Sequence, residues 1–191
     1  RTMMLRLGLA ALAFSGLAAC VSGGDEPDTE TACHGGGYRR DDGTVVGSIP
    51  RSAGDLRYQL MSGQTGVVLR GQDNVWRQVG GSVSITTGAC GSSTFAFEDE
   101  SDVRQGSKIP YTVQETVFDG VDGKRAGRLV LPAGGEADVI MVALHGSERW
   151  SGRTGERFQT LMPAFGIGVF AFDKRGTGAS EGKYTQDFHL L

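Results

Sequence analysis

The sequence has little cysteine, little proline, no excess of positive charge and no apolar run long enough to span a membrane. Its 19 lysines and arginines are outnumbered by 22 acidic residues, and a net charge of −3 gives no surface that favours nucleic acid. The apolar stretch Leu7–Leu17 has 11 residues, which is too short for a spanning helix. Five prolines against 31 glycines indicate many tight turns. The 191 residues, 39% of them hydrophobic, are typical of one or two globular domains.

The N-terminus has the pattern of an export signal. Two arginines and the apolar stretch precede a series of small residues. Leu17-Ala18-Ala19-Cys20 resembles the lipobox of bacterial lipoproteins, which implies cleavage before Cys20 and a lipid on this residue. The alternatives are a chance cysteine after an ordinary signal, or a core helix. We expect a signal peptide over residues 1–19, a flexible tether over 20–37, and an exported protein on the periplasmic side of the cell envelope, with its lipid in the inner or outer membrane.

Export changes the interpretation of Cys33 and Cys90. In an oxidising compartment they are the pair available for a disulfide, because Cys20 would carry the lipid. Two free thiols are the second alternative. A metal site with His34 is the third, although two cysteines and one histidine lack the paired ligand spacing of zinc sites. We expect no metal and no cofactor.

Residues 38–110 are predicted to form a β-rich segment. Short runs in which β-branched and aromatic residues alternate with polar ones are separated by Gly, Asn and Asp. Trp76 is expected in the core, and the acidic residues 98–102 are expected to be a solvated linker. The pattern indicates no activity. The five predicted strands are Thr44–Ile49, Leu56–Leu60, Gly66–Arg70, Ser82–Thr87 and Thr94–Phe97.

Residues 111–191 change to apolar runs that end in glycines and polar residues. A predicted hairpin with Asp122-Gly123 at its tip precedes the run Val139–Leu144, a helical apolar stripe over 154–165, and the run Ile167–Phe172. Continuous apolar runs are typical of parallel strands buried on both faces. We therefore predict an α/β fold, with a hairpin and then a parallel β-α-β unit. Its polar groups would lie at the carboxyl ends of the strands, where such sheets bind ligands.

The run Val139–Leu144 ends in the turn His145-Gly146, and the run Ile167–Phe172 ends in Asp173-Lys-Arg175-Gly176-Thr-Gly178-Ala-Ser180. With these two motifs, the series of elements resembles the opening of the α/β-hydrolase fold. The resemblance covers about residues 111–191 and implies the N-terminal part of a lipid-anchored bacterial serine hydrolase, which cleaves an ester, thioester or amide by acyl transfer. Its partners would be a small-molecule or peptide acyl substrate and, through the lipid, the membrane. The resemblance implies an oxyanion-hole backbone N–H at Ser147. It also implies supporting roles for His145, Gly146, Asp173, Arg175, Gly176, Gly178 and Ser180.

Ser180 also satisfies a literal nucleophile pattern, Gly178-Ala-Ser180-Glu-Gly182. A nucleophile elbow turns directly from strand to helix, whereas Asp173–Gly178 separates Ser180 from its strand. His189 comes too early in the chain for the family's catalytic histidine. We therefore expect an inactive fragment, with the catalytic serine, acid and histidine beyond Leu191.

Two other classes of function stay open. One is a non-catalytic envelope lipoprotein whose β-rich segment binds a partner. The other is a nucleotide-binding oxidoreductase, because Gly176-Thr-Gly178-Ala-Ser-Glu-Gly182 follows a predicted strand. The spacing of these glycines differs by one residue from the usual dinucleotide-binding pattern, which argues against this class.

Overall fold

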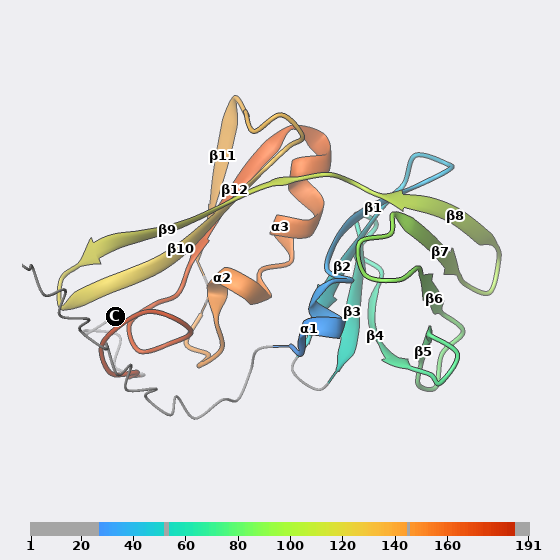
Figure 1. Ribbon diagram of the computed structural model, residues 1–191, viewed down its shortest axis with the longest axis horizontal. Helices are drawn as coiled ribbons and strands as arrows, with labels where there is room; N and C mark the ends of the chain where they lie inside the picture. Colours follow the sequence, from blue (N-terminus) through green and yellow to red (C-terminus); the bar gives the residue numbers. More distant parts are fainter. Residues whose placement is uncertain (1–26, 52–53, 145, 186–191) are drawn as a thin grey trace, which may run out of the picture.

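The computed structural model describes residues 27–51, 54–144 and 146–185 (Figure 1). One helical turn, α1 (Thr29–Ala32), precedes eight strands. These are β1 (Gly36–Arg40), β2 (Val45–Pro50), β3 (Asp55–Leu60), β4 (Thr65–Arg70), β5 (Val75–Gln78), β6 (Ser84–Thr87), β7 (Thr94–Glu98) and β8 (Val103–Lys108).

A second group of elements follows. It comprises β9 (Thr112–Gly120), β10 (Gly123–Leu131), β11 (Val139–Ala143), α2 (Gly152–Gly155), α3 (Phe158–Leu161), the 3-10 turn η1 (Met162–Phe165) and β12 (Ile167–Phe172). Among the described residues, no helix has the length and apolar character needed to cross a membrane.

The first eight strands form a closed antiparallel barrel. Each strand pairs with the next, and β8 pairs with β1 through Tyr38 and Lys108, which closes the ring. Successive side chains in a strand point to opposite faces, so every second side chain points into the barrel and fills its interior. Trp76 is 0% exposed, which confirms its expected place in the core. The core cluster consists of Tyr38, Val46, Leu56, Tyr58, Leu60, Val68, Trp76, Val83, Ile85, Phe95 and Phe97.

Three barrel strands were not predicted from the sequence. β1 and β8 each have a single apolar or aromatic residue, β5 has only four residues, and β8 has no buried position. They form strands because each has a hydrogen-bonding partner on both sides: β5 lies between β4 and β6, and closure of the ring pairs β1 with β8. Of residues 98–102, predicted to be a solvated linker, Glu98 ends β7 and the other four form the turn to β8, where the Asp99 N–H donates to the Asp102 carbonyl at 3.0 Å.

The other four strands form a separate sheet in the order β11-β12-β10-β9. β9 and β10 make an antiparallel hairpin with Val121 and Asp122 between the strands. β12 is antiparallel to β10 and parallel to β11. α2, α3 and η1 lie in the connection from β11 to β12, and Gly166, with φ of 84°, ends the last turn.

The predicted α/β fold and the resemblance to the α/β-hydrolase fold are wrong for this structure. Within the described ranges, ten of eleven strand pairings are antiparallel, and eight of twelve strands belong to the barrel. The helical segments have four residues each, too few to cover a sheet. Val139, Ile140 and Val142, predicted to be buried, lie on an edge strand and are 58%, 51% and 57% exposed. An apolar run alone does not show which element will cover it.

The helical turn α3 packs against the barrel and joins it to the second sheet (Figure 1). The Tyr111 hydroxyl donates to the Thr160 carbonyl at 3.0 Å, and Arg39 Nη2 donates to the Ala164 carbonyl at 3.0 Å. Gly47 permits this approach, because a Cβ there would overlap Thr160 Oγ1. The contact places α3 beside strands β1 and β2.

Candidate functional site

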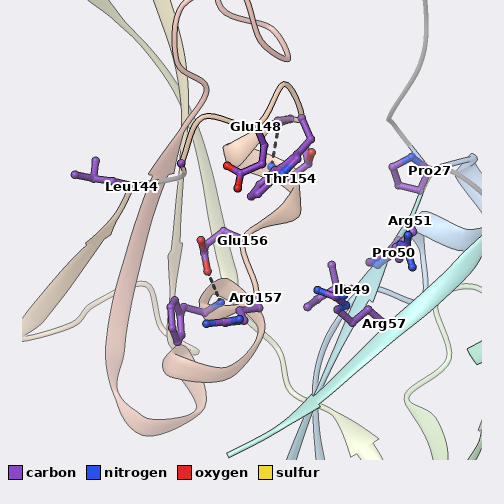
Figure 2. Close-up of a pocket in the computed structure, with 14 residues that line it drawn as sticks. Pro27, Ile49, Pro50, Arg51, Arg57, Leu144, Glu148, Thr154, Glu156 and Arg157 are labelled. Atoms are coloured by element: carbon purple, nitrogen blue, oxygen red, sulfur yellow. Dashed lines mark hydrogen bonds between the residues drawn. The ribbon is translucent and has the colours of Figure 1, made fainter. Parts of the chain in front are cut away.

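A pocket of about 550 Å³ lies between the barrel and the connection from β11 to α3, and we call it the interdomain pocket (Figure 2). Its barrel wall consists of Pro27, Ile49, Pro50, Arg51 and Arg57. Its opposite wall consists of Leu144, Gly146, Glu148, Trp150, Ser151, Thr154, Glu156, Arg157 and Phe158. The volume is within the range of small-molecule sites.

Two arginines in this pocket have no carboxylate partner. Arg57 on β3 and Arg157 before α3 come from opposite walls, and neither makes an ion pair with the described residues (Figure 2). Arg157 instead lies over the Phe158 ring, with its guanidinium carbon 4.9 Å from the ring centroid. Arg51 Nη1 lies 3.4 Å from Asp55 Oδ2, with which it forms an ion pair. The Glu156 carboxylate accepts a hydrogen bond from the Phe158 N–H at 3.0 Å. The pocket therefore has two guanidinium groups free to bind an anion.

The turn after β11 borders this pocket, and two side chains donate hydrogen bonds to its backbone carbonyls. Lys174 Nζ donates to the Gly146 carbonyl at 2.6 Å, and the Tyr184 hydroxyl donates to the Ser147 carbonyl at 2.5 Å. The sequence singled out neither Lys174 nor Tyr184, because a side chain that binds a distant carbonyl leaves no local pattern. His145, predicted to support this turn, lies outside the described residues.

Asp173 is the centre of a buried polar network at the end of β12. Its carboxylate accepts from Ser151 Oγ at 2.6 Å, from the Arg153 N–H at 3.0 Å and from the Ala179 N–H at 2.9 Å. The Arg153 side chain lies 3.4 Å away and also contacts Glu115. Because the side chain of Asp173 is fully buried, these donors replace its hydration.

Ser180 is part of the same loop. Its hydroxyl donates to the Asp173 carbonyl at 2.6 Å and accepts from the Ala126 N–H at 3.0 Å, and the residue is 9% exposed. Through these two hydrogen bonds, Ser180 links the loop after β12 to β10. No histidine within the described ranges forms a hydrogen bond with it.

The remaining loop residues that the sequence singled out shape the turn. Arg175 Nη1 pairs with Asp122 at 2.6 Å, at the hairpin tip. Gly176 and Gly178 have φ of 67° and 50°, in the left-handed region that favours glycine. A Cβ on Gly178 would also overlap the Asp173 carboxylate. The loop is thus built around Asp173, and not around the interdomain pocket.

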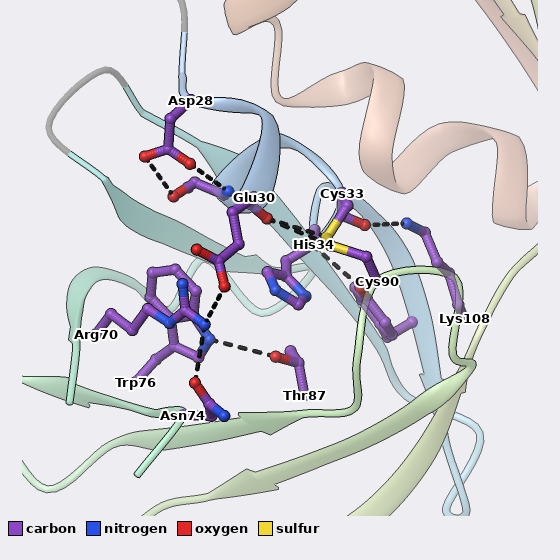
Figure 3. Close-up of a disulfide and its surroundings, with 12 residues drawn as sticks. Asp28, Glu30, Cys33, His34, Arg70, Asn74, Trp76, Thr87, Cys90 and Lys108 are labelled. Atoms are coloured by element: carbon purple, nitrogen blue, oxygen red, sulfur yellow. Dashed lines mark hydrogen bonds and ion pairs between the residues drawn. A yellow bond between two sulfur atoms is a disulfide. The ribbon is translucent and has the colours of Figure 1, made fainter. Parts of the chain in front are cut away.

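A second pocket of about 360 Å³ lies near one end of the barrel, and we call it the disulfide pocket (Figure 3). Cys33 and Cys90 are joined there, with 5.5 Å between Cα atoms, so the structure contains the first of the three alternatives left open above. His34 is 6% exposed, and its ring centroid is 5.7 Å from that of Trp76. Burial, followed by the nearby charges of Arg70 and Lys108, lowers the pKa of His34.

An ion pair crosses the disulfide pocket. Arg70 Nη2 donates to the Glu30 carboxylate at 2.6 Å and to Asn74 Oδ1 at 2.8 Å (Figure 3). Glu30 lies on α1 and Arg70 on β4, so the pair ties the N-terminal turn to the barrel. Cys20 and His189 lie outside the described residues.

No protein-family model matches the chain, and no curated protein is recognisably similar to it. No family is therefore available from which residue roles could be transferred.

Proposed function

We propose that the chain is a binding protein for a small amphipathic anion, which it holds in the interdomain pocket. This is a specific form of the non-catalytic class left open by the sequence. The observation that carries the proposal is the pair Arg57 and Arg157, which line the pocket from opposite sides without a carboxylate partner in the described part of the chain. A guanidinium group binds a carboxylate through two parallel hydrogen bonds.

The rest of the pocket favours an apolar group attached to that anion. Ile49, Trp150 and Phe158 line the pocket. Such side chains exclude water and strengthen the contact between charges. Because Glu148 and Glu156 also line the pocket, a ligand with one carboxylate fits better than a highly charged one. A fatty-acylated amino acid has this combination of groups.

N-octanoylglycine is a suitable probe. We expect the chain to bind it in calorimetry, and we expect Arg57→Gln or Arg157→Gln to weaken binding about tenfold, because each variant loses a charged hydrogen bond worth roughly 1.5 kcal/mol. The methyl ester of the probe, which has the same apolar tail and no charge, should bind about tenfold more weakly to the unmodified chain.

The matched control is Arg77→Gln. Arg77 is an exposed arginine on β5, paired with Asp73 and absent from the pocket wall. It should bind the probe like the unmodified chain. Equal affinity for acid and ester, or an equal loss in Arg77→Gln, would contradict the proposal.

A second candidate is acyl transfer, the serine-hydrolase activity expected from the sequence. The observation that favours it is that Gly146, the residue before Ser147, lines the same pocket. The test measures esterase, thioesterase and amidase activity of the chain. Ser147→Pro removes the N–H and should lower kcat about 100-fold or more, whereas Ser147→Ala retains it. A chain without any of these activities excludes this candidate.

Export, lipid attachment at Cys20 and the resulting membrane anchor stay predictions. The residues that carry them lie outside the described ranges.

A further inference from the structure

Three soft ligand atoms lie together beside the disulfide pocket. The Sγ atoms of Cys33 and Cys90 and a ring nitrogen of His34 are all within 4.8 Å of one another. Cys33 and His34 follow α1, and Cys90 lies between β6 and β7, 57 residues further along the chain. The fold has therefore assembled a ligand set that no local sequence spacing encodes.

We propose that reduction of the Cys33–Cys90 disulfide converts this cluster into a Zn²⁺ site with two thiolate ligands and one imidazole ligand. A dithiol reductant supplies two electrons and two protons, which breaks the S–S bond, gives two thiols and leaves the reductant as a disulfide. Zn²⁺ then displaces one proton from each thiol and forms two Zn–S bonds and one Zn–N bond. In the oxidised protein both sulfurs are bonded to each other and do not act as thiolate ligands.

The geometry requires only a small rearrangement. In a tetrahedral zinc site with bonds of about 2.3 Å to sulfur and 2.0 Å to nitrogen, ligand atoms lie roughly 3.5–3.8 Å apart. Rotation of the two cysteine side chains can bring the sulfurs to this separation, because their Cα atoms are already 5.5 Å apart. Cys90 is exposed and lies in a turn, so its side chain has room to rotate.

Contacts other than the disulfide hold the ligands in place. Lys108 Nζ donates to the Cys33 carbonyl at 2.8 Å, and the Tyr38 hydroxyl donates to the His34 carbonyl at 3.0 Å. The Arg70–Glu30 pair ties the preceding turn to β4. These contacts hold Cys33 and His34. The turn that carries Cys90 is closed by the Gly88 N–H, which donates to the Thr94 carbonyl at 3.1 Å, so the three residues should remain near one another after reduction.

A fourth ligand has space to bind. His34 and Cys90 line the 360 Å³ pocket, so a metal held by the three side chains would face this cavity. Three protein ligands and one open position are typical of zinc sites that hold a water molecule. We therefore expect a water molecule or another fourth ligand to reach the metal through the pocket.

Cobalt is the probe for the experiment, because a thiolate bound to Co²⁺ gives a charge-transfer band in the near ultraviolet. All proteins carry Cys20→Ser, which removes the thiol outside the cluster. After reduction with a phosphine, we expect one equivalent of Co²⁺ to produce the band and one equivalent of Zn²⁺ to abolish it. The oxidised protein should give no band.

Variants assign the ligands. Cys90→Ser should lose the band and weaken Zn²⁺ binding at least about 100-fold, since even residues that only support a zinc ligand contribute roughly 10- to 100-fold. His34→Asn should keep a thiolate band but bind Zn²⁺ more weakly. An equal band in the oxidised protein or in Cys90→Ser would overturn the proposal, as would a folded, reduced protein that does not bind Zn²⁺.

The proposal can also be tested if reduction unfolds the barrel. Zn²⁺ would then bind the folded form preferentially and restore the far-ultraviolet circular dichroism of the oxidised protein. A reduced chain that stays unfolded at saturating Zn²⁺ would overturn the proposal. Circular dichroism with and without Zn²⁺ makes this distinction.

Discussion

Replacing both Cys33 and Cys90 with serine will lower the free energy of unfolding by about 4 kcal/mol. The disulfide joins residues 57 positions apart, and the chain-entropy relation for a loop of this length gives about 4 kcal/mol at 25 °C. The closed loop includes β1 to β6, so most of the barrel is restrained in the unfolded state. Urea unfolding, followed by circular dichroism in the absence of added metal, measures the effect.

Cys20→Ser is the control for this measurement. It removes a thiol outside the 33–90 loop and should leave the unfolding midpoint unchanged. A loss below about 1 kcal/mol in the double variant would show that hydrogen bonds such as Lys108 to the Cys33 carbonyl restrain the segment nearly as well as the covalent bond.

Asp173→Asn will destabilise the second sheet by about 3 kcal/mol. The substitution keeps the size of the side chain but replaces one acceptor oxygen by an NH₂ group. Ser151 Oγ, the Arg153 N–H and the Ala179 N–H all donate to this carboxylate, so at least one buried donor would face another donor. Loss of the charge also removes a buried partner of Arg153. Chemical denaturation measures the change.

Asp119→Asn is the matched control on the same sheet. The Asp119 side chain is 83% exposed and pairs with Lys124 on the surface, so its loss should change stability by less than about 1 kcal/mol. Equal effects of the two substitutions would show that burial of Asp173 does not determine its contribution. Hydrogen exchange in β10 and β12 would locate the destabilised region, because the Asp173 loop is tied to both strands.

The sequence predicted strands and turns correctly where a local pattern is compatible with only one kind of secondary structure. Strands β2, β3, β4, β6 and β7 coincide closely with the alternating runs. The Asp122-Gly123 hairpin was found from its turn residues, and Trp76 was correctly placed in the core. Alternation and turn chemistry depend on neighbouring residues, and these are visible in the chain itself.

The candidate sites were much harder to predict. Arg57 and Arg157 are separated by 100 positions, and only the packing of α3 on the barrel places them around one pocket. Glu30 and Arg70, which cross the disulfide pocket, are likewise distant in sequence. No spacing rule applies to side chains brought together by the packing of elements that are distant in the chain.

The sequence by itself determined where most of the central strands form, where the chain turns and which cysteines are available for pairing. Tertiary structure decided that the eight strands close into a ring, that β11 is an exposed edge and that His34 lies beside both sulfurs. The physical reason is that alternation specifies which face of a strand is apolar, whereas burial of that face depends on elements far away in the chain.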